Sequence, residues 1–470
     1  MLGLAGLSLS ATAAPAAENR DPFGTGRYVS PAPHLKWESS ISLPEVKEAP
    51  SVRLQDAARP LSLPELTELA LQNNPKTRQA WYAARAAAAG VGIQQAEDLP
   101  QITGTFNLQR GELGGQSGNQ INWLTRYGPT ITLSYVLFDF GAGDSQLKAA
   151  QYLALAAALA QNRVLQDVVF LVEQAYYQLL GTEQLVRSNE LFLKSVKTSL
   201  DATQRRREAG LATVADVYRA ETQVAQAQLN LTRSQGGLEK ARGSLASAVG
   251  MQVNATLRVR TLEGEPRIRE VTESLDGMLV RAKAARSDLV AAEAQARAAR
   301  AQADAAAKAG LPTITINAAT GRTFFAHDRP FTETNTIALN LSIPIFTGFN
   351  RTYTVRQTEA RAAQAEAARD TLSRQTELEV WQSYYDVQTA AGGVSTTEVQ
   401  LKAAQQTAEA TLARYRAGFG SLLDLLTAQV DESNARVQRI QSYLDWFTAV
   451  ARLNYAIGAD DKVIYVIQPK

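Results

Sequence analysis

Four segments of the chain alternate between apolar and polar residues. In the first, Ile102, Phe106 and Leu108 alternate with threonine, asparagine and glutamine, and the other three segments show the same period of two. This pattern predicts strands that have one apolar face and one polar face. The predicted strands are about 101–110, 128–139, 312–321 and 335–346.

These strands would suit a bilayer as well as a soluble sheet. About ten residues are enough for a tilted strand to cross a membrane, and the threonine, serine and asparagine face would line a water-filled lumen. A half-buried antiparallel sheet in a soluble protein shows the same alternation. The strands alone therefore leave both structures open.

Two much longer segments, 141–206 and 349–414, contain no proline. Their apolar residues recur at steps of three and four, as in Leu165, Val168 and Val172. This spacing predicts a coiled-coil seam, and the frequent alanines permit close helix approach. Some 65 helical residues extend about 100 Å, because each residue adds about 1.5 Å. A globular core does not reach that length, so the pattern favours long helical hairpins.

The second half of the chain repeats the first. Upstream, Leu99-Pro100 and Leu311-Pro312 match at an offset of 212. Further along, the offset is 208 (418 − 210), and it relates Tyr176-Tyr177 to Tyr384-Tyr385, Gly210 to Gly418, and Gly250 to Gly458. An offset that stays constant over such a length indicates a tandem duplication. Each unit contains a helical stretch (about 64–98 and 270–309), two strands, a long helix, a glycine-containing break and a second long helix.

The duplication divides the chain into six parts. Residues 1–14 resemble a signal-peptide core that lacks the positively charged start, and a disordered alanine-rich tail is the alternative. Residues 15–60 are rich in proline, which predicts an extended lead-in. The remaining parts are the first repeat (61–255), a linker (256–269), the second repeat (270–460) and a C-terminal tail (461–470).

The composition argues against enzymatic catalysis, metal binding and nucleic-acid binding. The chain has 48 basic and 46 acidic residues, so its charge does not predict a nucleic-acid partner. Cysteine is absent and His34 and His327 are the only histidines, which leaves little material for disulfides, thiolate chemistry or a metal site. We therefore expect no enzyme, no cofactor, and no catalytic or metal-binding residues. No run of 18 apolar residues follows the N-terminus, which argues against a helical membrane span.

Four membrane-type strands cannot close a barrel within one chain. An open sheet in lipid leaves unpaired backbone groups at its edges, and each such group costs several kcal/mol. Three chains would supply twelve strands, which is within the range of closed outer-membrane barrels. Closure would also wrap the helical hairpins into a cylinder. The sequence therefore predicts a homotrimer.

Two turns and one strand end carry a resemblance to a known family. The turns are 206–217 (RREAGLATVADV) and 414–425 (RYRAGFGSLLDL), and the strand end is 341–348 (LSIPIFTG). Together with the duplicated order of strands and helices, they resemble the TolC-type outer membrane factor family over about residues 60–460. The resemblance implies a mainly α fold with membrane β structure. It implies a homotrimeric 12-stranded outer-membrane β-barrel, four strands per chain, continuous with a long periplasmic α-helical coiled-coil barrel.

The resemblance also implies a function and a location. Such proteins are the outer-membrane exit duct of a tripartite efflux pump or a type I secretion system in a Gram-negative bacterium, and they conduct substrates passively. The implied partners are a periplasmic adaptor (membrane fusion) protein, an inner-membrane transporter reached through the adaptor, and outer-membrane lipid. A periplasmic coiled-coil adaptor or scaffold without membrane strands is the alternative. The sequence does not identify the transported substrate.

The topology of such a duct places the connections between paired strands at the cell surface. We expect these loops at about 111–127 and 322–334, which are rich in glycine, asparagine, threonine and charge. Aromatic residues near the membrane interface would form a girdle there. The candidates are Trp123, Tyr127, Phe324 and Phe325.

The hairpin tips contain the candidate docking residues. Gly210 and Gly418 stand where a helix C-cap needs positive φ. The resemblance implies that the tips dock on the adaptor, and the exposed apolar contacts would be Leu211 and Phe419. The alternative is that both apolar side chains pack against their own helix ends.

Asp216 and Asp424 are the candidate gate residues. Each lies three positions after a hydroxyl residue, which is the spacing of an N-terminal capping box with aspartate in place of glutamate. The resemblance implies a second role, because acidic residues after the second turn form charge rings at the closed inner end. At the family's next acidic position in that ring, this sequence has Thr427. At a position where the family can carry a basic residue, it has Gly420. The sequence therefore supports at most a single aspartate ring, and capping remains the alternative for both residues.

Overall fold

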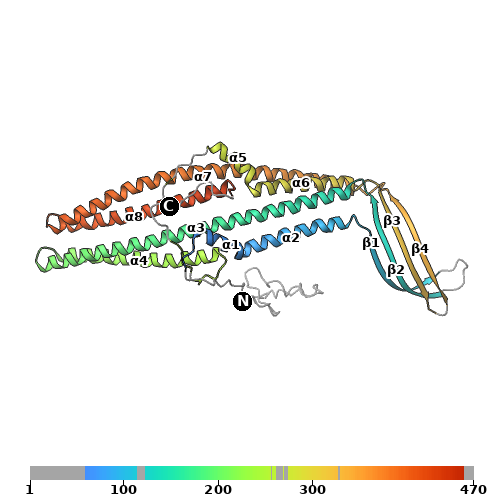
Figure 1. The fold of residues 1–470 in the computed structure, drawn as a ribbon, viewed down its shortest axis with the longest axis horizontal. Helices are drawn as coiled ribbons and strands as arrows, with labels where there is room; N and C mark the ends of the chain where they lie inside the picture. The colour runs from blue at the N-terminus through green and yellow to red at the C-terminus, as the bar shows by residue number, and fades with distance from the viewer. Residues whose placement is uncertain are drawn as a thin grey trace, which may run out of the picture. The chain divides into compact units, whose positions relative to one another are not determined.

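A computed structural model describes residues 59–113, 122–255, 257–260, 268, 274–326 and 329–459 (Figure 1). The first repeat contains α1 (Leu63–Asn73), α2 (Pro75–Ala96), β1 (Gln101–Leu113), β2 (Asn122–Phe138), α3 (Ala142–Glu208) and α4 (Val214–Ala248). The second contains α5 (Leu275–Ala285), α6 (Ser287–Lys308), β3 (Thr313–Phe325), β4 (Arg329–Ser342), α7 (Asn350–Arg416) and α8 (Leu422–Ala456). The signal-like segment 1–14, the C-terminal tail, and most of the lead-in and linker lie outside the described residues.

The two repeats share their element boundaries. α1 and α5, α2 and α6, and β1 and β3 are related by a shift of 212 positions, and α3 and α7, and α4 and α8, by a shift of 208. The strand hairpins share one register as well. Gln101 pairs with Ser134 in the first hairpin, and the shifted residues Thr313 and Ser342 pair in the second. The duplication is therefore confirmed at the level of backbone pairing.

The helical stretch that opens each repeat is two helices rather than one. The chain bends at Asn74, where the residue before Pro75 is held in an extended conformation with ψ of 128°. The second repeat bends at the shifted position, Arg286, without a proline. Because the second bend depends on packing, the sequence pattern alone did not reveal it.

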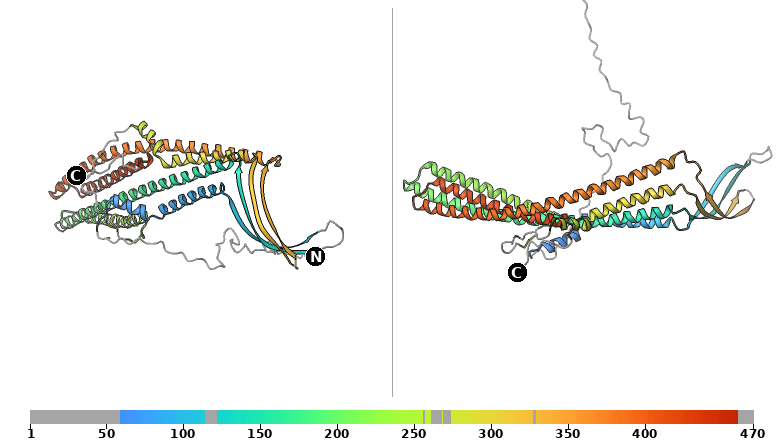
Figure 2. Two further views of the ribbon diagram at one scale, coloured as in Figure 1. Left: turned by 45° about the vertical axis from the view of Figure 1, so that its right-hand side comes forward. Right: turned by 90° about the horizontal axis from the view of Figure 1, so that it is seen from above.

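The strands form one antiparallel sheet in the order β1-β2-β3-β4. Both views in Figure 2 show this sheet continuing from one end of the helical layer. Apolar side chains on the sheet are exposed to a degree that is unusual for a soluble protein, for example 68% for Phe106 and 81% for Ile337. Such a surface is typical of a sheet that faces lipid.

The strand ends differ from the predicted ones. β1 extends to Leu113 and β2 begins at Asn122, so that the expected loop 111–127 is mostly strand, and 322–334 is mostly β3 and β4. The remainder of the first loop lies outside the described residues. At the opposite end β4 stops at Ser342 rather than near residue 346, because Pro344 has no N–H to donate to a sheet.

The long helices pair as their apolar spacing predicted. α3 packs on α4, α7 packs on α8, and the two hairpins meet along α3 and α8 (Figure 1). At this contact the rings of Tyr177 and Phe447 stack with centroids 4.7 Å apart. Leu444 lies over Gly181 so closely that a Cβ on the glycine would be 2.3 Å from its side chain. Glycine is therefore required for the two helices to approach here.

α3 also qualifies the argument against helical membrane spans. It contains an 18-residue window with a mean hydropathy of 1.3, which is long and apolar enough to cross a membrane by length and composition alone. The sequence argument considered only uninterrupted apolar runs and was therefore too strong. In the structure α3 packs against α2 and α6, and 17% of that window is buried within the described chain.

Each repeat connects its helical bend to the end of its last helix. In the first repeat the amide of Asn74 donates to the Ala248 carbonyl at 3.0 Å. In the second, the guanidinium of Arg286 donates to the Ala456 carbonyl at 3.5 Å. The two bends thus use different side chains at the same shifted position to satisfy the carbonyl end of a helix.

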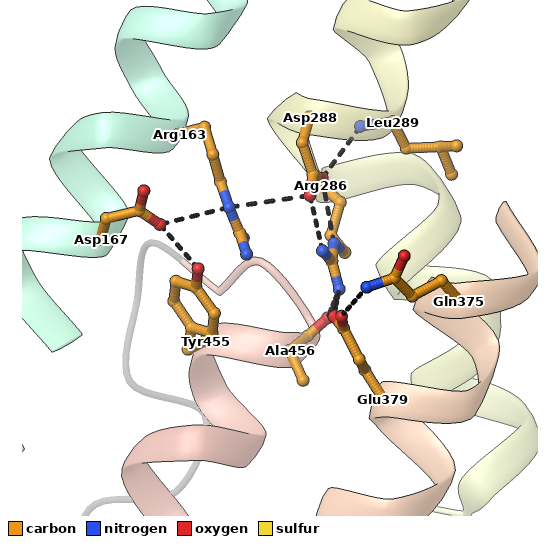
Figure 3. A network of polar contacts seen from close by, with 9 residues as sticks. All are labelled: Arg163, Asp167, Arg286, Asp288, Leu289, Gln375, Glu379, Tyr455 and Ala456. Carbon is orange, nitrogen blue, oxygen red and sulfur yellow. Dashed lines mark hydrogen bonds and ion pairs between the residues drawn. The ribbon is translucent and has the colours of Figure 1, made fainter. Parts of the chain in front are cut away.

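A polar network surrounds Arg286, whose side chain is only 2% exposed (Figure 3). Its guanidinium contacts Asp288 at 2.5 Å and Glu379 of α7 at 2.6 Å. Arg163 of α3 lies 3.7 Å from Asp288 and stacks over the ring of Tyr455, with its guanidinium carbon 3.9 Å from the centroid. We call Arg163, Arg286, Asp288, Glu379 and Tyr455 the mid-helix network. It connects the first repeat to three helices of the second.

The network favours the ionised form of Asp288. Burial alone would raise the pKa of Asp288, but hydrogen bonds from Arg286 and the nearby charge of Arg163 hold that pKa below its usual value. Burial and the hydrogen bond to Asp167, 2.6 Å away, raise the pKa of Tyr455 to about 12. The Asp288 carboxylate is therefore charged at neutral pH.

We predict that Arg286→Ala destabilises the helical region by about 1.5–3 kcal/mol, because the half-buried carboxylates of Asp288 and Glu379 lose their hydrogen bonds to the buried guanidinium. Arg297→Ala is the matched control, since its ion pair with Glu293 is exposed and should matter little. Because the pKa of Asp288 is lowered in the folded chain, the network's contribution is complete above about pH 4 and is lost as the pH falls through the lower folded value. Denaturant unfolding followed by circular dichroism at several pH values measures both effects, and equal losses in the two variants would contradict the prediction.

Candidate functional site

The two hairpin tips have the same backbone structure. Gly210 follows the C-cap of α3 with a φ of 74°, and the N–H of Leu211 donates to the carbonyl of Arg206 at 2.7 Å. Gly418 follows the C-cap of α7 with a φ of 85°, and the N–H of Phe419 donates to the carbonyl of Arg414 at 3.0 Å. These are Schellman caps, in which glycine accepts the left-handed conformation at no steric cost. The positive φ predicted for both glycines is confirmed.

The apolar residue after each glycine points away from its own helix. Leu211 is 69% exposed and Phe419 is 83% exposed. In a Schellman cap this residue often packs back on the preceding turn, which was the alternative interpretation. Neither side chain does so within the chain. Each tip therefore presents one large apolar side chain to its surroundings.

The tip of the first repeat contains a complete capping box. The N–H of Asp216 donates to the hydroxyl oxygen of Thr213 at 3.2 Å, and the Asp216 carboxylate accepts from the Thr213 N–H at 3.0 Å. The hydrogen bonds from the backbone and hydroxyl of Thr213 lower the pKa of Asp216. Capping thus accounts for this carboxylate.

Asp424 lies at the shifted position but has a different environment. The N–H of Asp424 donates to the Ser421 hydroxyl oxygen at 3.1 Å, which caps the N-terminus of α8. This is only half of a capping box, because the Asp424 carboxylate does not accept a hydrogen bond from the Ser421 N–H. Among the described residues, no hydrogen bond or ion pair engages the Asp424 carboxylate, and the side chain is exposed. The sequence spacing predicted equal capping for both aspartates, and only Asp216 completes the box.

A set of contacts that the sequence did not indicate connects the two tips. Tyr415 is buried, its hydroxyl lies 3.1 Å from that of Thr203, and its carbonyl accepts from Arg206 at 2.7 Å. Further from the turns, the side-chain amide of Gln429 donates to the hydroxyls of Ser195 and Ser199 at 2.8 and 3.0 Å. These residues lie more than 200 positions apart in the chain, and only the packing of the first helical hairpin on the second brings them together.

The position of Gly420 is explained by the same tyrosine. A Cβ at Gly420 would lie 3.0 Å from the backbone nitrogen of Tyr415, which is tighter than ordinary contacts. A basic side chain is therefore hard to place at this point. The guanidinium that contacts Tyr415 comes instead from Arg206 of the first repeat.

Aromatic side chains gather at both ends of the sheet. At the loop end the rings of Tyr127 and Phe324 stack with centroids 5.7 Å apart, as the girdle expectation requires. The side chain of Trp123 is outside the described residues. At the helical end, not anticipated from the sequence, Phe138 packs on Phe140 and Phe346 on Phe349.

The spacing of these two aromatic groups fits a membrane. Along β2, Tyr127 and Phe138 are separated by a rise of about 37 Å, which becomes about 26 Å along the barrel axis for a strand tilted by about 45°. The apolar band of an outer-membrane barrel is about 25 Å tall. Phe140 and Phe349 have positive φ, at 58° and 63°, and hold their exposed rings at the point where strand becomes helix. Such backbone conformations are costly for a bulky residue.

Within the described ranges, no three histidine, aspartate or glutamate side chains gather in a way that would hold a metal ion. The charged groups instead form the mid-helix network and the tip contacts. The arrangement supports packing, capping and surface recognition.

Comparison with known proteins places both repeats in one family. The family model described as outer membrane efflux protein matches residues 66–251 and 278–459, once in each repeat. The chain is 30% identical to the protein CyaE of Bordetella pertussis, over 83% of this chain and 82% of CyaE. It is 24% identical to the alkaline protease secretion protein AprF of Pseudomonas aeruginosa, over 87% of each. The fold matches the crystal structure of the outer membrane protein VceC from Vibrio cholerae with a TM-score of 0.74, at 22% identity, over 84% of this chain and 96% of VceC.

Proposed function

The chain belongs to the outer membrane efflux protein family, and we propose that three copies assemble into a closed channel that receives its substrates from an adaptor and an inner-membrane transporter. The protein is an outer-membrane exit duct for efflux or type I secretion, and its large helical part lies in the periplasm. Its relatives are channel proteins rather than enzymes.

One observation carries the proposed trimer. The sheet has two free edges, β1 and β4, and an exposed apolar face. In lipid the backbone groups of a free edge have no water to bond with, so the sheet must close on other copies. Three copies give twelve strands, and an even number per chain keeps every neighbouring pair antiparallel.

We expect three subunits in mild detergent. Native mass measurement of the purified protein should give three times the chain mass, and the β-sheet signal in circular dichroism should disappear when the trimer dissociates. A stable monomer that retains full β-content would contradict the proposal, because its edges would then be satisfied within one chain.

The hairpin tips are proposed as the adaptor contact. Leu211 and Phe419 are exposed apolar side chains on a rigid turn, and buried apolar anchors supply most of the affinity in many protein interfaces. The Schellman caps fix the backbone of both turns, so no backbone entropy needs to be lost there on binding.

Replacing both Leu211 and Phe419 with Asp should abolish export while the trimer still forms. Val253→Asp with Val280→Asp is the matched control, because these side chains are 69% and 70% exposed but lie far from the tips. Export assays and trimer yield in detergent extracts are the measurements. Normal export by the tip variant would show that the adaptor binds elsewhere.

The Asp424 carboxylate is proposed as the gate charge. It is exposed and has no capping partner, whereas the Asp216 carboxylate is held in its capping box. In a trimer it would recur three times around one axis, and such a ring of like charges attracts cations.

We predict that Asp424→Asn reduces cation selectivity and weakens block by multivalent cations on the order of tenfold, since a charge contact near a protein surface is worth about a kcal/mol or more. Asp216→Asn is the control, because its carboxylate is engaged in capping and the selectivity should stay unchanged. Single-channel recordings of both variants measure the effect. Unchanged selectivity in the Asp424→Asn variant would contradict the gate role, and an equal loss in both variants would assign that role to both carboxylates.

A further inference from the structure

The charged side chains of the sheet are divided unequally between its two faces. Among the strand residues whose side chains the structure describes, the charged ones are Arg110, Arg126, Arg322 and Glu333. Three of them alternate in step with exposed apolar residues such as Leu108 and Ile337, and therefore lie on the apolar face. The fourth, Arg126, is the only one on the polar face.

Arg126 is held in place on that face by the neighbouring strand. It lies an even number of positions from Thr130 and Thr132 of β2, and it stands directly opposite Gln109 in the pairing of β2 with β1. Its Nε and Nη2 atoms both donate to Oε1 of Gln109, at 3.1 and 2.7 Å. The guanidinium is thus fixed on the face that lines the lumen of a closed barrel.

The charge of Arg126 is not compensated, in contrast to that of Arg322 on the apolar face. The Nε and Nη2 atoms of Arg322 lie 2.8 and 2.7 Å from the Glu333 carboxylate. The partner of Arg126 is an uncharged amide, and no carboxylate of the described residues lies within ion-pair distance of its guanidinium. Because a guanidinium stays protonated in proteins, each chain carries one unpaired positive charge on the polar face.

Arg126 lies near the loop end of the sheet. Its neighbour in sequence is Tyr127, whose ring stacks on Phe324 at that end. Eight positions (134 − 126) separate it from Ser134, which pairs with Gln101 at the helical end. This separation is about 27 Å along the strand and about 19 Å along the axis of a barrel whose strands are tilted by about 45°. Since the apolar band is about 25 Å tall, Arg126 lies in the outer part of the barrel.

We propose that the three copies of Arg126 form a basic ring inside the barrel near its exit, and that this ring favours anionic substrates. The inference rests on the proposed trimer and names a substrate class for the same duct. Twelve strands that lie about 4.8 Å apart and are tilted by about 45° close into a barrel about 26 Å across. Each charge then lies within about 13 Å of the axis, close to the Debye length of about 10 Å at 0.1 M salt. The field of the ring therefore reaches across the lumen.

The proposed ring is independent of the Asp424 charge at the hairpin tips. α3 has 67 residues and separates the sheet from the tips by about 100 Å, which is many Debye lengths. The two charges therefore act on a substrate one after the other. A cationic substrate is attracted at the inner end and repelled at the exit, whereas an anionic one that has passed the inner end is attracted at the exit.

A simpler role for Arg126 is to hold β1 and β2 together through Gln109. The two roles make opposite demands on the charge of the partner residue. Gln109→Glu would turn the contact into an ion pair, which keeps the strands joined but cancels the positive charge in the lumen. A purely structural contact would tolerate that change, and a charge ring would be lost.

The exit can be probed from its outer side in planar lipid bilayers. The charged helical part cannot cross lipid, so trimers added to one compartment insert with the loop end of the barrel facing the other. Peptides of ten glutamates or ten lysines are then added to the loop side and driven in by voltages of equal size and opposite sign. The frequency of transient current blockades measures how often each peptide enters the barrel.

We expect the glutamate peptide to enter more often than the lysine peptide at 0.1 M salt. Arg126→Gln should lower entry of the glutamate peptide about fivefold or more, because three charges about 13 Å from the axis act together in water. Arg126→Lys retains the charge and should retain the preference. At 1 M salt, where the Debye length is about 3 Å, the preference should disappear in every variant.

Arg110→Gln is the matched control. It removes the same charge one residue from Gln109 but on the apolar face, so peptide entry should stay unchanged. Gln109→Glu should lower entry of the glutamate peptide as Arg126→Gln does. Because it preserves the contact between the strands, it also tests the ring if Arg126→Gln fails to assemble.

The outcomes separate this inference from the duct itself. Channels of normal conductance in which Gln109→Glu leaves entry of the glutamate peptide unchanged overturn the ring and leave the duct intact. An equal loss in Arg110→Gln also overturns it, because the preference would then come from the charge of the whole barrel end. If the unmodified protein forms neither trimers nor channels, both the ring and the proposed function are wrong.

Discussion

The unpaired edges of the four-stranded sheet are the constraint on which the rest of the structure depends. β1 and β4 each present a row of backbone donors and acceptors, and lipid cannot satisfy them. A chain with this sheet is stable in a membrane only as part of a closed assembly. The exposed apolar face and the two aromatic groups at the sheet ends are consistent with that setting. The helical hairpins continue from the strands, so barrel closure also arranges the helices around one axis.

The two repeats share one order of helices and strands, but they are not chemically equal. The mid-helix network occurs in the contact between the repeats, and the shifted positions of Arg163 and Tyr455 are Thr371 and Ser247, which carry no charge and no ring. The contact between the repeats is thus held by the ion pair of Arg163 with Asp288 and by the stacking of Arg163 on Tyr455.

The hairpin tips show the same divergence on a smaller scale. Both ends share a Schellman cap followed by a hydroxyl residue and an aspartate. The first aspartate is used by the backbone, and the second is left exposed. Identical backbone structure therefore leaves one carboxylate free for another role, and one apolar side chain exposed at each tip.

Local patterns in the sequence determined the elements, the duplication, the positive φ of Gly210 and Gly418, and the need for closure, because each depends on residues near one another or on a constant offset. The sequence misjudged the strand ends, since these depend on where pairing partners continue, and it treated Asp216 and Asp424 alike because their spacing is the same. Only the tertiary structure brought Arg163 to Asp288 and Arg206 to Tyr415. Their contacts join segments more than 100 residues apart, and no local pattern encodes which helix faces meet. Packing of α3 against the second repeat decides that, because it alone sets which side chains share a buried space.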